Sequence, residues 1–347
     1  MASDAERAAM QRALRLAATP GVDRGPNPRV GAVVLDADGR VVGEGFHRGV
    51  GSAHAEVVAL SDAGDAARGA TVVVTLEPCH HQGRTGPCTQ ALLAAGVARV
   101  VFGQPDVNPV ARGGGDALRA AGVSVEGGVH REEAARLNPV WSFAVRHGRP
   151  LVTLKTASTL DGRTAAADGT SRWITGPEAR AQVHRLRAQV EAVVVGTGTA
   201  LVDDPHLSAR AADGSLLPHQ PLRVVLGDRA LPASARVLDD AAPTLLVPGH
   251  DVEGLLTSLV DRDVQHVLLE GGPTLTAAFV RAGLVDRMVG YLAPALLGDG
   301  PSLIADFGAT TIDDARRLEL DEVRRVGSDI RWTALLHPDA PPFEGDD

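Results

Sequence analysis

This chain of 347 residues has few cysteines, few aromatic residues and almost no lysine. Its two cysteines cannot make a disulfide framework, so we expect both thiols to be reduced. With a net charge of −9 and 3% aromatic residues, it lacks the basic, aromatic-rich face of a nucleic-acid-binding protein. No apolar run approaches the roughly 20 residues that span a bilayer, so we expect no membrane segment. These absences favour a protein that acts on small molecules.

The N-terminus lacks the pattern of a targeting signal. Met1–Arg7 has no basic region leading into an apolar stretch, so we expect a cytoplasmic protein. The length suits two domains of moderate size, and a hydrophobic fraction of 44% supplies residues for two cores. A Gly- and Pro-containing break at His147–Pro150 separates them. We therefore predict domains over residues 1–147 and 148–347.

Helical and strand patterns alternate through residues 1–147. We predict helices over Asp4–Ala18, from His54, after Pro87, from Gly115 and over Arg131–Arg146, and strands over Val30–Leu35, Val41–Gly45, Thr71–Leu76, Arg99–Phe102 and a segment ending near Val125. This alternation, which begins αββαβαβα, predicts a three-layer α/β/α domain.

Residues 148–347 are predicted to form a second α/β domain. It begins with a strand at Leu151–Lys155, and further strands are expected at Ala192–Gly196, Leu222–Leu226, Thr244–Val247, Val267–Leu269 and Asp286–Tyr291, with helices at Pro177–Ala188 and Pro273–Ala282. Two strands, Arg317–Val326 and Ile330–Leu336, are expected to close the domain as a hairpin. The Pro- and Asp-rich segment from about residue 337 to residue 347 is predicted to be disordered.

Four residues supply the groups of a hydrolytic zinc site. His54, Cys79 and Cys88 provide one imidazole and two thiolates, which leaves the fourth zinc position for water. Glu56 provides a carboxylate that can carry a proton from the water to the leaving amine. We expect all three ligands to lie near helix N-termini, where the helix dipole favours thiolate.

Two other arrangements of these residues remain open. Cys79 and Cys88 could form a disulfide, although a reducing compartment disfavours it. Alternatively, His80 or His81 could complete a closed structural zinc site, which would have no use for Glu56.

Two weaker signals lie in the second half. Of 34 basic side chains, Lys155 is the only lysine, so either this is chance or the position needs a compact ammonium group. No G-x-G-x-x-G motif is present, but Glu270-Gly271-Gly272 lies between a predicted strand and a predicted helix. Such glycines let backbone N–H groups approach a phosphate, although an ordinary strand-to-helix turn explains them equally well.

The zinc-site residues carry a family resemblance. Zinc deaminases have H-x-E followed by P-C-x-x-C, and here the cysteines are separated by eight residues instead of two. That spacer contains Gly83-Arg84-Thr85. A further motif, Pro26–Gly31, lies upstream of His54. Together these motifs resemble the deaminase domain of the bifunctional riboflavin-biosynthesis deaminase/reductase family, which implies a cytidine-deaminase-like fold and Zn²⁺.

The resemblance also implies substrate contacts in this domain. Asn27 and His81 would touch the substrate, although an asparagine between two prolines also fits a simple turn. Gly86 departs from the family's usual Thr-Pro-Pro-Cys, but this change removes no metal ligand.

The second half resembles the reductase domain of the same family. The motifs occur in the same order: Lys155–Arg163, Ser171–Thr175, Leu186–Ala188, Asp203–Pro205 with Leu207 and Arg210, and Glu270–Gly272. The resemblance implies a dihydrofolate-reductase-like fold that uses NADPH. The implied cofactor contacts are Ala157, Trp173, Thr199, Asp203, Gly272, Pro273, Thr274, Leu275, Thr276, Ala277 and Ala278. The implied substrate contacts are Lys155, Ser171, Arg187, Leu207, Arg210 and Glu270.

Some of these residues also have simpler interpretations. Trp173 could be a core residue, Arg187 a solvated helix residue and Asp203-Asp204-Pro205 a turn. Two arginines in the set nevertheless suit a phosphate ester, because each can present two parallel donors.

The sequence therefore predicts a two-domain enzyme of riboflavin biosynthesis. A zinc-dependent deaminase would remove an amino group from a phosphoribosylamino-pyrimidinone, and an NADPH-dependent reductase would convert the ribosyl group to ribityl. We expect a homo-oligomer with a small-molecule substrate and no nucleic-acid or membrane partner. Two alternatives are a nucleic-acid-editing deaminase and a deaminase whose second half is a non-catalytic oligomerisation module.

Overall fold

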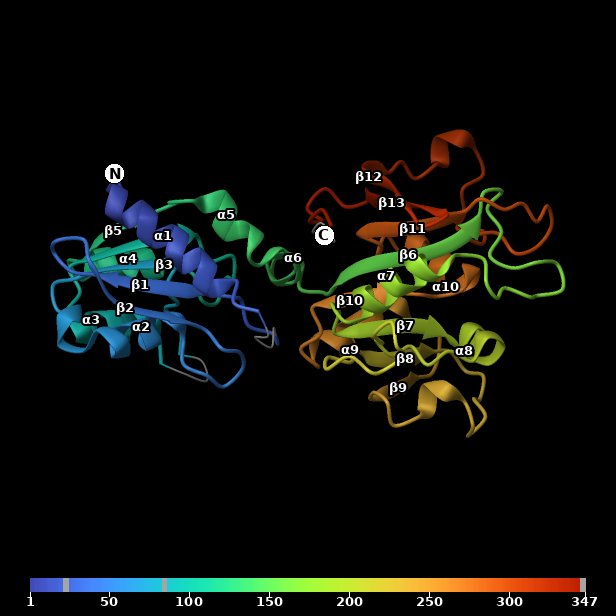
Figure 1. The fold of residues 1–347 in the computed structure, drawn as a ribbon, viewed down its shortest axis with the longest axis horizontal. Coiled ribbons are helices and arrows are strands. Elements are labelled where there is room, and N and C mark those ends of the chain that lie inside the picture. Colours follow the sequence, from blue (N-terminus) through green and yellow to red (C-terminus); the bar gives the residue numbers. More distant parts are fainter. Residues whose placement is uncertain (21–24, 83–85, 344–347) are drawn as a thin grey trace. The chain divides into compact units, whose positions relative to one another are not determined.

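The computed structural model describes residues 1–20, 25–82 and 86–343. The chain divides into two compact units, Met1–Arg146 and His147–Asp347, so the division falls beside the boundary expected from the sequence. Each unit has its own sheet (Figure 1) and is described by itself.

The first unit alternates helices and strands in the predicted order. Its elements are α1 (Asp4–Ala17), β1 (Gly31–Leu35), β2 (Val41–Phe46), α2 (Ala55–Ala63), η1 (Gly64–Ala67), β3 (Thr71–Leu76), α3 (Cys88–Ala95), β4 (Arg99–Gln104), α4 (Gly114–Ala120), β5 (Ser124–Gly127), α5 (Arg131–Arg136) and α6 (Pro139–His147).

Its five-stranded sheet has the order β2-β1-β3-β4-β5. β3, β4 and β5 are parallel, whereas β1 runs antiparallel to β2 and β3. Met10 and its neighbours on α1 pack against one face, and apolar residues of α2, α3 and α4 pack against the other. The result is the expected three-layer arrangement, in which the carboxyl ends of β3 and β4 lie at one edge.

The predicted helix over residues 131–146 is instead two helices, α5 and α6. Asn138 lies at the break, where its side chain accepts a 2.6 Å hydrogen bond from Arg29 N–H and donates a 2.8 Å bond to Arg29 O. Pro139 lacks an N–H to continue the first helix. A contact with a residue more than a hundred positions away therefore sets this boundary.

The second unit begins with β6 (Leu151–Thr159). The elements that follow are α7 (Pro177–Arg187), β7 (Ala192–Gly196), α8 (Thr197–Asp203), β8 (Leu222–Leu226), η2 (Arg236–Leu238), β9 (Thr244–Val247), α9 (Val252–Val260), β10 (His266–Leu269), α10 (Pro273–Arg281), β11 (Arg287–Ala293), η3 (Ile312–Asp314), β12 (Glu319–Val326) and β13 (Asp329–Leu335). The sequence did not predict α8 or α9.

Its eight-stranded sheet has the order β12-β13-β11-β6-β10-β7-β8-β9. The six strands from β11 to β9 are parallel, and the β12–β13 hairpin adds an antiparallel edge (Figure 1). Apolar residues of α7 cover one face, while those of α9 and α10 cover the other. In such sheets, ligands bind beyond the carboxyl ends of the parallel strands.

The C-terminal segment packs on this sheet as far as Phe343, although it was predicted to be disordered from residue 337. Arg287 donates hydrogen bonds of 3.1 Å to the carbonyl groups of Pro341 and Pro342, and its guanidinium lies 4.2 Å from the centre of the Phe343 ring. These contacts hold the segment on the sheet despite its polar composition. Among the described residues, no helix is both long and apolar enough to cross a membrane.

Candidate active sites

Three metal-binding side chains meet at one edge of the first unit's sheet. His54 immediately precedes α2, Cys88 is the first residue of α3, and Cys79 lies in the connection that follows β3. His54 Nδ1 lies 3.0 Å from Cys88 Sγ and 3.6 Å from Cys79 Sγ. A tetrahedral zinc ion separates its nitrogen and sulfur ligands by roughly 3.6 Å, so these donors fit zinc.

The two cysteines are free thiols rather than a disulfide. A hydrogen bond from Cys88 lowers the pKa of the Cys79 thiol to about 4, and Cys88 N–H also donates to Cys79 Sγ at 3.4 Å. The same pairing, together with burial, raises the pKa of Cys88. The two sulfurs thus share one proton at the start of α3, and a divalent cation that replaced it would leave two thiolates.

Glu56 is the second residue of α2 and only 4% exposed. Burial raises the pKa of its carboxyl group, opposed by hydrogen bonding and by the nearby His54. A raised pKa makes the ionised carboxylate a stronger base, which suits proton transfer. The cluster of ligand atoms contains His54, Cys79 and Cys88 but neither His80 nor His81, and His80 Nδ1 instead lies 3.0 Å from Thr89 Oγ1.

Asn27 and His81 lie in the same unit. Asn27 Nδ2 lies 2.9 Å from His47 Nε2, and the His47 ring meets the His54 ring edge-on at 5.5 Å. Nδ1 of His81 is buried and makes no hydrogen bond within the part of the chain that is described. The Gly83-Arg84-Thr85 motif lies outside the described residues.

Glu77 braces the connection that carries Cys79. Its carboxylate accepts a 3.0 Å hydrogen bond from Asp106 N–H and a 2.9 Å bond from Gly115 N–H, which links β3, β4 and α4. The neighbouring Gly114 is closely packed, since an added Cβ would lie 1.8 Å from the Pro78 carbonyl oxygen. At Gly86, by contrast, an added Cβ would meet no atom of the described residues within 4 Å.

Asp106 also lies at this site, although it was not predicted from the sequence. It follows β4, is 8% exposed, and has its pKa raised to about 6, chiefly by burial and further by Glu77 and Cys79. Gln104-Pro105-Asp106 at the carboxyl end of a strand beside β3 could have indicated it, because adjacent parallel strands bring such ends together.

In the second unit, three charged side chains from separate elements meet. Arg187 on α7 donates two hydrogen bonds to the Glu270 carboxylate, at 2.6 and 2.9 Å, and Lys155 Nζ on β6 lies 3.8 Å from the same carboxylate. Arg187 is therefore not a solvated helix residue. Glu270 directly follows β10, next to the strand that carries Lys155.

Burial and charge compete in this cluster. Burial alone would raise the pKa of Glu270, but the charges of Arg187 and Lys155 outweigh it and hold that pKa below its ordinary value. Burial lowers the pKa of Lys155, opposed by Glu270. The cluster holds two cations against one anion, which suits an anionic or electron-rich substrate.

The start of α10 faces α8. Gly272 precedes α10, its N–H donates a 3.1 Å hydrogen bond to Thr199 Oγ1, and Pro273 is the first helical residue. A Cβ on Gly272 would approach Thr199 Oγ1 to 3.2 Å, so the position favours glycine. The helix N-terminus at the carboxyl end of β10 fits the pyrophosphate of a dinucleotide. The remaining predicted cofactor contacts on this segment are Thr274, Leu275, Thr276, Ala277 and Ala278.

Asp203 is the last residue of α8 rather than part of a turn. Its carboxylate accepts a 3.3 Å hydrogen bond from Ser171 Oγ, and its carbonyl oxygen accepts one from Arg172. Trp173 is 69% exposed and is therefore not a core residue; Arg180 lies 4.5 Å from its ring centre. Ala157 lies two residues beyond Lys155, on the same face of β6.

The segment after α8 is fixed by Asp239. Its carboxylate accepts a 2.6 Å hydrogen bond from the fully buried Arg223 and lies 2.8 Å from His206 Nδ1. Burial would raise the pKa of Asp239, but these partners lower it to about 2. The side chain of Leu207, predicted to touch substrate, lies in the core at 2% exposure, so only its backbone is available for contact.

Arg210 is the remaining predicted substrate contact. Its guanidinium donates hydrogen bonds of 3.0 Å to Ser208 Oγ and 2.9 Å to the Gly214 carbonyl group. Arg187 also reaches the Ser208 carbonyl group, at 3.3 Å, so the two arginines share a neighbour.

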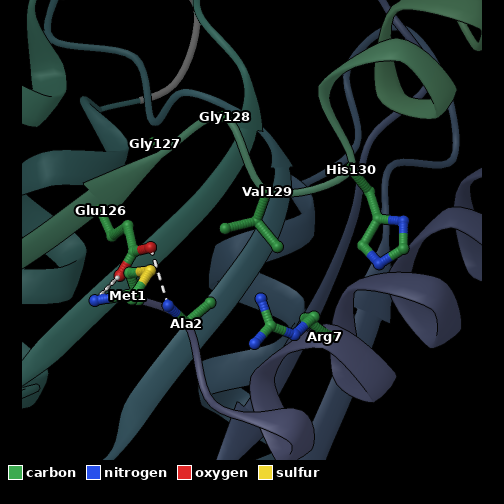
Figure 2. Close-up of a pocket in the computed structure, with 8 residues that line it drawn as sticks. All are labelled: Met1, Ala2, Arg7, Glu126, Gly127, Gly128, Val129 and His130. Atoms are coloured by element: carbon green, nitrogen blue, oxygen red, sulfur yellow. Dashed lines mark hydrogen bonds and ion pairs between the residues drawn. The ribbon is translucent and has the colours of Figure 1, made fainter.

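A small pocket lies elsewhere in the first unit (Figure 2). Its eight lining residues are Met1, Ala2, Arg7, Glu126, Gly127, Gly128, Val129 and His130. Glu126 accepts a 2.7 Å hydrogen bond from Ala2 N–H there. None of these residues is a predicted site residue, so the pocket carries neither predicted activity.

Comparison with known families matches both units. Residues 3–104 match the cytidine and deoxycytidylate deaminase zinc-binding region, and residues 150–332 match the RibD C-terminal domain. The first unit is thus a zinc-binding deaminase domain and the second an NADPH-dependent reductase domain. The presence of both favours the predicted pair of activities over a non-catalytic second half.

Individual relatives extend over nearly the whole chain. Riboflavin biosynthesis protein RibD of Mycobacterium tuberculosis is 50% identical over 307 residues, which is 88% of this chain and 90% of the relative. The Escherichia coli protein is 41% identical and covers 92% and 96%. The structure of Acinetobacter baumannii RibD has a TM-score of 0.82 at 38% identity and covers 95% and 98%. The chain therefore belongs to the RibD family of bifunctional deaminase/reductase enzymes of riboflavin biosynthesis.

Proposed function

We propose that the first unit removes the 2-amino group of 2,5-diamino-6-(5-phosphoribosylamino)pyrimidin-4(3H)-one and that the second reduces the product's ribosyl group to ribityl. A Thermotoga maritima structure, 34% identical with a TM-score of 0.77, covers 96% of this chain and 99% of its own. Its title is diaminohydroxyphosphoribosylaminopyrimidine deaminase/5-amino-6-(5-phosphoribosylamino)uracil reductase. The observation that supports the proposal most directly is the cluster of His54, Cys79 and Cys88 beside Glu56.

In the deaminase, His54, Cys79 and Cys88 hold Zn²⁺. A Zn²⁺ ion held there would lower the pKa of a water molecule and so supply a nucleophile at neutral pH. Glu56 takes a proton from this water and delivers it to the departing amino group. Its raised pKa matches that role, because an effective general base titrates close to the working pH.

The pyrimidine lies against three polar side chains. Asn27 is oriented by His47 at 2.9 Å, and His81 presents a buried ring nitrogen. Asp106 adds a buried carboxyl group whose pKa of about 6 lets it accept a hydrogen bond from a ring N–H or amino group when ionised.

In the reductase, the chain's residues hold NADPH and orient the sugar. The cofactor supplies the hydride for C1′ of the ribosylamino group. Gly272 and Pro273 at the start of α10 would hold its phosphates, with further contacts from Thr199 and Asp203 on α8, Ala157 on β6 and the exposed ring of Trp173. The residues from Thr274 to Ala278 complete this contact.

The substrate is held by the charged cluster. Arg187 and Arg210 bind its phosphate with Ser171 and the backbone at Leu207, while Glu270 binds sugar hydroxyl groups. Opening of the sugar ring requires a proton at the ring oxygen, and Lys155 donates it. The support is the lowered pKa of Lys155, which makes its ammonium group a better acid.

The two steps are tested together with purified enzyme, the diaminopyrimidine ribotide and NADPH. Ammonia release and NADPH absorbance are followed separately. We expect ammonia without NADPH, and NADPH oxidation only once deaminated product is present. Ammonia release without any later oxidation would support the alternative of a non-catalytic second half.

We also infer a homo-oligomer in the cytoplasm. The support is a row of exposed apolar residues on and beside the edge hairpin: Leu318 (40% exposed), Leu320 (62%), Val323 (56%) and Ile330 (42%). Sedimentation of wild type against Leu320→Glu tests it, with a shift toward monomer expected in the variant.

A further inference from the structure

We propose that His147, His337 and Asp339 form a second metal site, which takes a divalent transition-metal cation. His147 ends α6, and the other two residues follow β13. All three belong to the second unit. The site is separate from the zinc ligands of the deaminase and does not depend on the reactions proposed above.

The three donor groups already lie close together. Nε2 of His147 is 3.4 Å from Oδ2 of Asp339. The His147 and His337 rings meet edge-on with their centres 4.7 Å apart. One ligand atom from each of the three residues lies within 4.8 Å of the others. Coordination at about 2.0–2.2 Å requires donors roughly 3.3 Å apart, so side-chain movements of about 1 Å would complete the site.

The donor set determines the kind of cation. Two imidazoles with one carboxylate suit Zn²⁺, Co²⁺ or Ni²⁺, whereas Mg²⁺ and Ca²⁺ prefer oxygen ligands. The Asp339 side chain is 56% exposed and that of His147 is 23% exposed, so an ion can enter from solution and retain water in a remaining position.

The backbone on both sides of the site is anchored to one residue, Asp286. Its carboxylate receives two hydrogen bonds from Arg149, at 2.8 and 2.7 Å, two residues after His147. Its carbonyl oxygen accepts a 3.0 Å bond from His337 N–H. Two ligands are therefore held in place before a cation arrives, which lowers the entropic cost of binding.

Loading the site has a cost. Asp339 N–H now donates a 3.1 Å hydrogen bond to His337 Nδ1, and the ring must give up that bond to present a lone pair to a metal. A neutral hydrogen bond contributes little compared with a metal–imidazole bond, so coordination prevails.

Metal binding would join the beginning of the second unit to the segment after its last strand. A link between such distant positions restricts the unfolded chain, and a cation that binds only the folded form stabilises it. The structure thus assigns to this site the role of a metal clasp on the reductase unit.

The test uses untagged, metal-free protein with Cys79→Ser and Cys88→Ser, which removes the deaminase metal site. Titration with Co²⁺ is expected to show one saturable equivalent whose spectrum lacks thiolate-to-cobalt charge transfer. At Co²⁺ about 100 times the dissociation constant, we expect the unfolding midpoint to rise by roughly 5 °C. The wild-type chain should take two equivalents, one of them with the thiolate band.

Matched variants identify the ligands. Adding His337→Ala should abolish the remaining equivalent and the thermal shift, and Asp339→Asn should weaken both. His250→Ala should change neither, since His250 pairs with Asp228 at 3.5 Å on the surface of the same unit. NADPH-dependent activity confirms that each variant's second unit is folded. Absence of saturable Co²⁺ binding in the cysteine variant, or binding unaffected by His337→Ala, would overturn the proposal.

Discussion

The two active sites differ in how much of their chemistry the chain itself supplies. In the deaminase unit, three ligand atoms and a buried carboxyl group gather at the starts of α2 and α3. In the reductase unit, the groups come from β6, α7, α8 and β10 and surround an ion-pair cluster. A metal needs donors at fixed distances, whereas a cofactor that carries its own reactive atom needs only binding and orientation.

This contrast has a consequence for mutations. Loss of one group should nearly abolish deamination, because the three ligands hold one metal ion together and Glu56 alone carries the proton. Loss of one of the reductase groups that only bind, such as Arg187, should mainly weaken binding, whereas Lys155 has a proposed step of its own. The predictions below test that difference, beginning with the largest expected effect.

Glu56→Gln should lower the deaminase kcat about 10³-fold, because the amide cannot accept the proton. Zinc content, measured by elemental analysis, should remain near one ion per chain at the deaminase site. Reductase activity on the deaminated product should be unchanged and serves as the internal control. Full deaminase activity in this variant would contradict the role given to Glu56.

Arg187→Ala should lower the reductase kcat/KM about 10²-fold, mainly through KM. The substitution leaves Glu270 buried without its bidentate partner and removes the proposed phosphate contact. Arg185→Ala, an exposed arginine on the same helix, is the matched control. Ammonia release should be the same in both variants. An equal effect of the two substitutions would show that position 187 has no special role.

Gly114→Ala should destabilise the first unit by about 2 kcal/mol and weaken zinc retention. Its Cβ would meet the Pro78 carbonyl oxygen at 1.8 Å and displace the connection that carries Cys79. Gly86→Ala, in the same connection but with no described atom within 4 Å of the added Cβ, should behave like wild type. Chemical denaturation and zinc release to a chelator measure the two effects.

The smallest effect concerns acid stability of the second unit. The pKa of Asp239 is lowered to about 2 from 3.8, so its ionised form stabilises the fold above about pH 4. That stabilisation declines as the pH falls through about 2. Because its side chain is 34% exposed, we expect about 1 kcal/mol after screening by solvent. Denaturation at pH 4 and pH 2 should show a smaller loss in Asp239→Asn than in wild type.

Much of the fold could be predicted because hydrophobic periodicity is local. Strand β3 has the predicted bounds, Thr71–Leu76, and α1 differs by one residue. Helix α8 was missed because its Thr197-Gly198-Thr199 start has low helix propensity, so packing against β7 must stabilise it. For α9 a signal existed in the N-cap Asp251, whose side chain accepts a hydrogen bond from Gly254 N–H.

The candidate sites were predictable to different degrees. The spacing of His54, Glu56, Cys79 and Cys88 encodes the zinc chemistry directly. The pairing of Lys155, Arg187 and Glu270 depends on the order of strands in a sheet, which no local pattern records. These three residues were predicted from the family resemblance. Asp106 was not predicted and was found only in the structure.

One detail of α2 limits how this enzyme can evolve. His54 occupies the N-cap position of the helix and Glu56 is its second residue, and successive helical residues are rotated by about 100°. A single inserted residue between them would turn the carboxyl group to another side of the helix. The described residues of the connection between β3 and α3, 77–82 and 86–87, are neither helix nor strand, so a change of length there would not rotate a ligand as an insertion in α2 would.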